Sequence, residues 1–133
     1  MAHMLMAVAA LIVLAGSPAA AQSTPAGKWL AEDIDGGVVN GPQTTLDVAE
    51  DGTVSGTGGC NGYRGTAEFS VTAINFGPLA ATKKACEPAV MAQETKFHKA
   101  LEEAKGWQID AATRKLTLLD AKGKELVRFA PLE

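Results

Sequence analysis

A glycine-rich stretch around the first cysteine constrains the fold of this chain more than any other segment. Residues 56–65 contain Cys60 among closely spaced glycines. Glycine adopts backbone conformations that a Cβ atom would obstruct, so we expect the chain to turn sharply here. The other cysteine, Cys86, lies just before a segment with helical spacing. A bond between the two sulfurs would tie the glycine loop to the start of that helix.

The N-terminus has the pattern of an export signal. An apolar run over residues 5–14 is too short to span a bilayer, and small residues that end at Ala21 follow it. We predict cleavage after Ala21, so that residues 1–21 are a signal peptide and residues 22–27 a disordered tail. The alternative is a buried N-terminal helix. Ser17 stands where a lipoprotein signal requires cysteine, so we expect a periplasmic or secreted protein without a membrane anchor.

Export also decides the chemistry of the two cysteines. In an oxidising compartment, an even number of cysteines favours a disulfide over a metal site or a catalytic thiol. Closing the loop between Cys60 and Cys86 would add about 3.5 kcal/mol of stability on the chain-entropy scale. The alternative is a thiol enzyme with Cys60 as nucleophile. Such an enzyme needs a base, and His98 is the only histidine after the predicted cleavage site.

The pattern of apolar residues predicts one α+β domain over residues 28–133. Pro88 opens a predicted helix over residues 88–104, whose apolar residues recur every three or four positions and should pack on a sheet. We expect a curled antiparallel sheet or small β-barrel of about seven strands, closed by that helix. The predicted strands cover residues 28–34, 45–49, 53–55, 66–69, 73–76, 107–109, 115–119 and 125–129.

Composition and spacing argue against several classes of function. The net charge of −3 is evenly spread, and the densest basic pair is Lys83–Lys84, so we expect no nucleic-acid partner. The glycines do not follow the spacing of phosphate-binding loops, and no serine has the context of a hydrolase nucleophile. The acidic residues do not fit a calcium loop, and a lone histidine does not make a transition-metal site. We therefore expect no catalytic residues, no metal and no cofactor.

A few polar residues stand out as candidates for contacts. Asn61 can cap the loop or accept left-handed backbone. The alternative is that Asn61, Tyr63 and Arg64 form an exposed contact with an anion or a partner. Glu94 falls on the inward stripe of the helix, where an unpaired carboxylate would be costly. We expect it to form a structural ion pair with Lys83 or Lys84, or a hydrogen bond with backbone. An acid of raised pKa is the alternative.

Three motifs carry a resemblance to a known family. They are Gly-Cys-Asn at residues 59–61, residues 74–86 with their closing Thr-x-x-Ala-Cys, and Met91, Glu94 and Phe97 on the helix. Together they resemble the META domain of the heat-shock protein HslJ-like family over residues 27–129. The resemblance implies a small envelope protein that is linked to heat shock and antibiotic tolerance and has no established enzymatic activity.

The resemblance also implies a shape and a way of acting. Relatives of the family look like a type III secretion pilotin, a cracked β-barrel that binds lipid or a partner's tail. We therefore expect a monomeric, non-enzymatic periplasmic module that binds an unknown protein or lipid and supports envelope stress tolerance. The binding cleft would lie between the helix and the sheet, with an aromatic lining of Trp29, Phe69, Phe76, Phe97 and Trp107.

Overall fold

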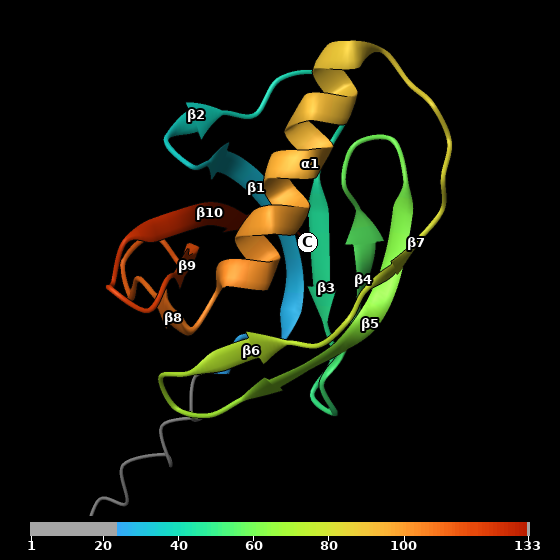
Figure 1. Cartoon of the computed structure of the whole chain (residues 1–133). Coiled ribbons are helices and arrows are strands. Elements are labelled where there is room, and N and C mark those ends of the chain that lie inside the picture. Colours follow the sequence, from blue (N-terminus) through green and yellow to red (C-terminus); the bar gives the residue numbers. More distant parts are fainter. Residues whose placement is uncertain (1–23, 133) are drawn as a thin grey trace, which may run out of the picture.

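The computed structural model describes residues 24–132, and the predicted signal peptide with its cleavage site lies outside them. A curled antiparallel sheet carries one helix across its opening (Figure 1). The helix is α1 (Pro88–Glu103), and the strands are β1 (Gly27–Ile34), β2 (Gly37–Val38), β3 (Thr45–Val48), β4 (Thr53–Thr57), β5 (Gly62–Phe69), β6 (Ile74–Phe76), β7 (Ala80–Ala81), β8 (Gly106–Ile109), β9 (Leu116–Leu119) and β10 (Glu125–Pro131).

The strands follow the path β6-β5-β4-β3-β1-β10-β9-β8, with β2 added beside β1 and β7 beside β5. The two ends of this path meet at an antiparallel bridge between Ala73 and Gly106. Two backbone bonds reinforce it, from Ile74 N–H to Lys105 O (3.1 Å) and from Trp107 N–H to Thr72 O (3.1 Å). The result is a nearly closed barrel with one seam, which confirms the predicted α+β class. The strands number ten because two pieces of two residues each join the sheet.

Helix α1 begins and ends almost where its sequence indicates. Pro88 occupies the first turn, where its missing N–H has no intrahelical acceptor in any case. The buried residues of α1 are Glu94, Phe97, Ala100 and Leu101, at the three- and four-residue spacing of one helical face. This face packs against β1, β10 and β6, so the helix covers the interior of the barrel.

Large apolar side chains fill that interior. Phe97 of the helix and Phe129 of β10 are fully buried, with ring centroids 6.3 Å apart. Trp29 is also buried, at 6% exposure. Trp29 and Phe97 are therefore core residues, and they do not line an open cleft as their aromatic character suggested. Packing of this kind contributes about 1.5–3 kcal/mol for each large apolar side chain removed from water.

The glycine-rich stretch forms more strand than loop. Gly56 ends up in β4 and Gly62–Gly65 in β5, so the turn between the two strands is short. A Cβ atom on Gly65 would lie 2.5 Å from Leu79 Cδ2 and 2.9 Å from Pro78 O. Glycine is needed at Gly65 because another segment crosses close above the strand, and not because the chain turns there.

The predicted disordered tail is too long at its C-terminal end. Pro25 is fully buried, and its carbonyl oxygen accepts a hydrogen bond of 2.8 Å from Trp29 Nε1. Strand β1 begins at Gly27, so the described residues from Thr24 onward belong to the folded domain. A buried indole N–H requires an acceptor, and the tail supplies it.

Candidate functional site

A disulfide joins the turn after β4 to the segment before α1. Cys60 and Cys86 are bonded, with Cα atoms 6.0 Å apart and a sequence separation of 26 residues. This confirms the predicted pairing, and no described cysteine is a free thiol. A nucleophile at Cys60 would first require reduction of this bond, because the thiolate is the reactive form. The thiol-enzyme alternative stays a prediction for a reduced state.

Glu94 reaches from α1 into the turn that carries Cys60. Its Oε1 accepts backbone N–H bonds from Cys60 (3.1 Å) and Asn61 (2.6 Å), and its Oε2 accepts a bond of 2.8 Å from Asn61 Nδ2. None of the ion pairs within residues 24–132 includes Glu94. The predicted ion pair with a lysine is therefore wrong, and the predicted backbone bond is confirmed. Amide donors stabilise the buried carboxylate in place of a cation.

Asn61 links three segments of the chain. Besides its bonds to Glu94, its Oδ1 accepts bonds from Thr82 Oγ1 (2.8 Å) and Lys84 N–H (2.7 Å), and its Nδ2 donates to Lys84 O (3.2 Å). The side chain is only 3% exposed. Asn61 is therefore a buried structural residue, which corrects its prediction as a surface contact. The turn, the segment before the helix, and α1 meet at this amide.

Gly58 makes room for that arrangement. A Cβ atom at this position would lie 2.6 Å from Glu94 Cγ and 2.8 Å from its Oε1. Real Cβ atoms do not approach other atoms so closely, so the Glu94 side chain can occupy this position only because residue 58 is a glycine. We refer to Gly58, Cys60, Asn61, Glu94 and Cys86 as the polar junction.

The polar junction also sets the protonation of Glu94. Burial by itself raises the pKa of this carboxyl, because it disfavours the charged form. The hydrogen bonds from Asn61 and Cys60 favour the carboxylate and outweigh burial, with a smaller contribution from His98, so the pKa lies below its usual value. Glu94 is ionised at neutral pH, which argues against the alternative of an acid with a raised pKa.

Tyr63 and Arg64, the other two predicted contact residues, face opposite sides of β5. Tyr63 is 2% exposed, and its hydroxyl donates a bond of 2.7 Å to Thr45 O. Burial, followed by the negative charge of Asp47, raises its pKa well above the ordinary value. Tyr63 is therefore a core residue, and its prediction as a surface contact is wrong. Arg64 is exposed, so its role in a contact stays a prediction.

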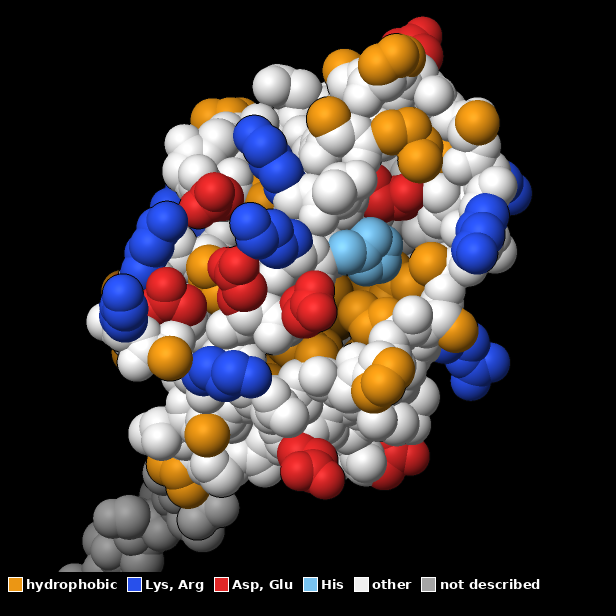
Figure 2. Space-filling view, viewed as in Figure 1, with side chains coloured by type: hydrophobic (Ala, Val, Ile, Leu, Met, Phe, Trp, Pro, Cys, Tyr) orange, Lys and Arg blue, Asp and Glu red, His pale blue; other side chains and the backbone are white. Residues whose placement is uncertain are grey.

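A cleft of about 600 Å³ opens between α1 and the segment that leads from β6 to β7. In Figure 2 the pale blue histidine, the one histidine among the described residues, lies against an apolar surface. We call this hollow the α1–β7 cleft, and its lining consists of Phe76, Gly77, Pro78, Leu79, Ala81, His98 and Glu102. The sequence predicts Phe76 as lining and His98 only as a catalytic base, and it carries no signal for the other residues of the cleft.

His98 has surroundings that a histidine at a helix surface seldom has. Its ring lies edge-on to Tyr63, with centroids 5.3 Å apart and planes at 82°, and it also packs near Phe97 at 5.9 Å. Its Nε2 atom is shut off from solvent and has no hydrogen-bond partner. It is the single buried side-chain nitrogen or oxygen without a partner in residues 24–132. Such atoms are rare in folded proteins, and each one calls for an explanation.

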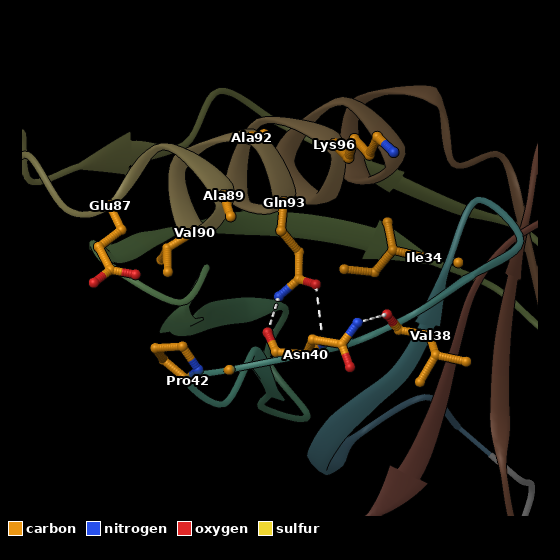
Figure 3. A pocket seen from close by; sticks show the side chains of 12 residues that line it. Ile34, Val38, Asn40, Pro42, Glu87, Ala89, Val90, Ala92, Gln93 and Lys96 are labelled. Carbon is orange, nitrogen blue, oxygen red and sulfur yellow. Dashed lines mark hydrogen bonds between the residues drawn. The ribbon is translucent and has the colours of Figure 1, made fainter.

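Of the other hollows on the described part of the molecule, two bear on the predictions. One of about 490 Å³ lies between the β2 loop and the first turns of α1 (Figure 3). Gln93 spans it, accepting a bond from Asn40 N–H (3.1 Å) and donating one to Asn40 O (3.0 Å). The other, of about 580 Å³, lies at the barrel seam, where the predicted lining residues Phe69 and Trp107 are found. The predicted aromatic lining is thus divided among the core, the seam and the α1–β7 cleft.

The described part of the chain offers few other kinds of site. Between Thr24 and Leu132, no three His, Cys, Asp or Glu side chains come together as metal ligands would. Over the same residues, no helix combines the length and the apolar character needed to cross a bilayer.

The fold and its polar junction define a small disulfide-linked β-barrel with one covering helix. The sequence profile of the META domain matches residues 22–132. The chain belongs to the META domain family. No curated protein matches it.

Solved structures agree on the fold. An NMR structure of a protein from Burkholderia xenovorans is 24% identical, with a TM-score of 0.61, and the match covers 80% of this chain and 81% of the other. A second NMR structure is 23% identical, with a TM-score of 0.60, and covers 79% and 88% of the two chains. A crystal structure of a DUF4847 family protein from Bacteroides vulgatus is 23% identical over 65% of this chain and 57% of its own, with a TM-score of 0.50. At these identities the likeness concerns the fold alone.

Proposed function

We propose that this META-domain protein is a non-enzymatic module of the periplasm or extracellular space that binds an apolar ligand or partner segment in the α1–β7 cleft. The observation that carries the proposal is the buried Nε2 of His98, which lacks a partner although the residue lines a cleft walled by apolar side chains and Glu102. A molecule that enters the cleft and draws the His98 ring toward itself would supply that partner and cover the apolar lining. Binding sites commonly combine apolar walls with a few polar groups of this kind.

The surroundings of the other side chains that could act as a nucleophile or a base favour a binding function over catalysis. Cys60 is held in a disulfide, and Glu94 already accepts three hydrogen bonds. The Tyr63 hydroxyl is engaged with Thr45. A catalytic base or nucleophile has to reach its substrate, and these groups are engaged within the fold. His98 remains as a group that can recognise a ligand.

The location outside the cytoplasm rests on two features. The sequence has the pattern of a cleavable export signal ending at Ala21, and the folded domain carries a disulfide of the kind that oxidising compartments sustain. Ser17 does not provide the thiol that a lipid anchor requires. We accordingly propose that the mature protein is a monomer without a membrane anchor. It would support envelope stress tolerance by binding its ligand or partner.

Fluorescence of the neutral apolar probe N-phenyl-1-naphthylamine tests the proposal. Leu79→Asp places a charge in the cleft lining, whereas Val38→Asp places the same charge on an exposed side chain of β2, which is 72% exposed and outside the cleft. The probe should bind the wild type and Val38→Asp, and binding should be lost in Leu79→Asp. Equal binding by all three proteins, or none by the wild type, would contradict the proposed site.

A further inference from the structure

The geometry of the α1–β7 cleft points to a particular occupant. We propose that it binds an extended segment of a partner polypeptide, which pairs with the free edge of β7 and meets His98 on the opposite wall. This inference rests on the proposed binding function and specifies the partner. Three independent observations carry it: an unpaired strand edge, an unpartnered imidazole nitrogen, and the charge of the lining.

Strand β7 has a neighbour on one side alone. It pairs with β5 through Tyr63↔Ala81 and Arg64↔Ala80, and no second strand pairs with it in the described sheet. Just after β7, the Thr82 N–H donates to Gly62 O at 3.0 Å. Backbone groups point to alternate sides along a strand, so the N–H and C=O of Ala81 point away from β5. Ala81 is exposed and lines the cleft, which leaves its backbone groups for another strand.

The opposite wall carries the imidazole of His98, and a rotation of this ring would turn its enclosed Nε2 toward the cleft. The Nε2 of His98 is buried and without a partner, and a neutral imidazole nitrogen can either donate or accept a hydrogen bond. A peptide backbone carries both donors and acceptors at regular spacing, so it can satisfy β7 and His98 together. A simple hydrocarbon chain can satisfy neither.

The lining between these walls suits small or aliphatic side chains. Phe76, Pro78 and Leu79 contribute apolar surface along the cleft, and Ala81 leaves space beside the strand edge. Recognition by strand addition takes its affinity from backbone bonds and its specificity from pockets that receive alternate side chains. The lining fits a segment with aliphatic residues at alternate positions.

The charges near the cleft disfavour an anionic occupant. Glu102 is the one residue of the lining with a permanent charge, and Glu94 lies one helical turn before His98. Arg64 is exposed on β5, but it is not part of the lining. A carboxylate head group, as in a fatty acid, would approach Glu102 unfavourably. The occupant we infer is therefore an uncharged or basic aliphatic peptide.

Selection from a displayed library of random decapeptides tests the inference with an unbiased probe. We expect enrichment of sequences with aliphatic residues at alternate positions and Lys or Arg in place of acids. The best peptide, made synthetically, should bind the oxidised full-length mature protein and shift the amide resonance of Ala81. Methylation of its alternate backbone nitrogens should weaken binding at least about ten-fold, the effect of a lost hydrogen bond and a steric block.

A variant of the protein tests the same strand edge without any change to the peptide. Ala81→Pro removes the outward N–H, while the Thr82 bond to Gly62 remains, and proline is tolerated at strand edges. We expect at least about ten-fold weaker binding with a thermal midpoint close to wild type, and no loss for Val38→Thr. If Ala81→Pro does not fold, the N-methylated peptides give the answer alone.

The outcomes separate this inference from the function on which it rests. If N-phenyl-1-naphthylamine or decanoate binds in the cleft but the library yields no peptide, the module binds apolar small molecules and the inference is wrong. Peptide binding that tolerates backbone methylation would also overturn it, because the strand edge would then play no part. If nothing binds, the proposed function fails with it.

Discussion

Two polar side chains one turn apart on α1 have opposite surroundings. The Glu94 carboxylate accepts three hydrogen bonds from the turn that carries Cys60, whereas the Nε2 of His98 has no partner at all. Both groups are shielded from water, so the difference is not one of exposure. A fully satisfied buried group holds a fold together, while an unsatisfied one lowers stability unless a ligand completes it. We therefore assign a structural role to the polar junction and a role in ligand recognition to the α1–β7 cleft.

Glu94→Ala should give the largest effect. The substitution leaves the N–H groups of Cys60 and Asn61 and the amide of Asn61 without their acceptor, and it opens space in the junction. We expect a loss of about 4 kcal/mol in the free energy of unfolding, measured by urea denaturation. Glu102→Ala, on an exposed part of the same helix, should change it by about 0.5 kcal/mol or less. Similar values for the two variants would remove the distinction between junction and cleft.

Removing the disulfide should have an effect nearly as large. Cys60→Ser with Cys86→Ser opens a loop with a sequence separation of 26 residues, which costs about 3.5 kcal/mol on the chain-entropy scale. Dithiothreitol should lower the stability of the wild type by a similar amount and leave the double variant unchanged. A double variant as stable as the oxidised wild type would show that the hydrogen bonds of Asn61 hold the junction without covalent help.

Gly58→Ala should have an intermediate effect. The added methyl group would lie 2.6 Å from Glu94 Cγ, so the carboxylate must move and its bonds must lengthen. We expect a loss of about 2 kcal/mol, typical of overpacking. Gly41→Ala is the control: its φ of +81° strains alanine, but no atom lies within 4 Å of the new Cβ, and about 1 kcal/mol is expected. A smaller loss at Gly58 than at Gly41 would contradict the close approach.

Acid should weaken the polar junction in a defined direction. The pKa of Glu94 is lower in the folded protein than its ordinary value of 4.5, so the folded state favours the carboxylate. Its contribution is complete above that value and is lost as the pH falls through the lowered folded-state pKa. Asp51, Asp110 and Asp120 have pKa values lowered by turn hydrogen bonds and will contribute too. Urea midpoints of wild type and Glu94→Gln should therefore differ more at pH 7 than at pH 3. A constant difference would mean that Glu94 is not charged in the fold.

His98→Leu should have the smallest effect on stability and a large one on binding. Replacing a buried nitrogen that has no partner by an apolar side chain should change the free energy of unfolding by less than about 1 kcal/mol, with a gain as the expected direction. Affinity for the selected peptide should fall at least about ten-fold, measured by isothermal titration calorimetry. A loss of stability above about 2 kcal/mol would make the imidazole part of the structure and remove the case for a ligand.

Local patterns in the sequence predicted the architecture well. Helix α1 followed from Pro88 and the spacing of Phe97 and Leu101, and the antiparallel sheet followed from alternation and turn residues. The disulfide was predicted from the pattern of an export signal and the even cysteine count. The helix and the strands could be predicted because they depend on residues that are neighbours in sequence. The disulfide could be predicted because the redox state of the expected compartment is the same for every cysteine of the chain.

The site depended on contacts that no local pattern reveals. Gly65 reads as a turn residue, yet its role is set by Leu79 crossing above it. Tyr63 and Asn61 looked like surface residues because they belong to a polar, glycine-rich stretch, but the hairpin turns both inward. The partners of Glu94 lie more than thirty residues away in sequence, so amides could not be told from lysines in advance. The significance of His98 became visible only in the structure, where it lines the same cleft as Leu79 and Ala81.

Amide hydrogen exchange at two adjacent residues tests the central claim most directly. Thr82 N–H is bonded to Gly62 O, whereas Ala81 N–H is predicted to point away from β5 toward the α1–β7 cleft. In the free protein we predict slow exchange at Thr82 and fast exchange at Ala81, and saturation with the selected peptide should slow Ala81 at least about ten-fold. An Ala81 amide that is already protected in the free protein, or that exchanges equally fast with the peptide bound, would contradict a strand-binding cleft.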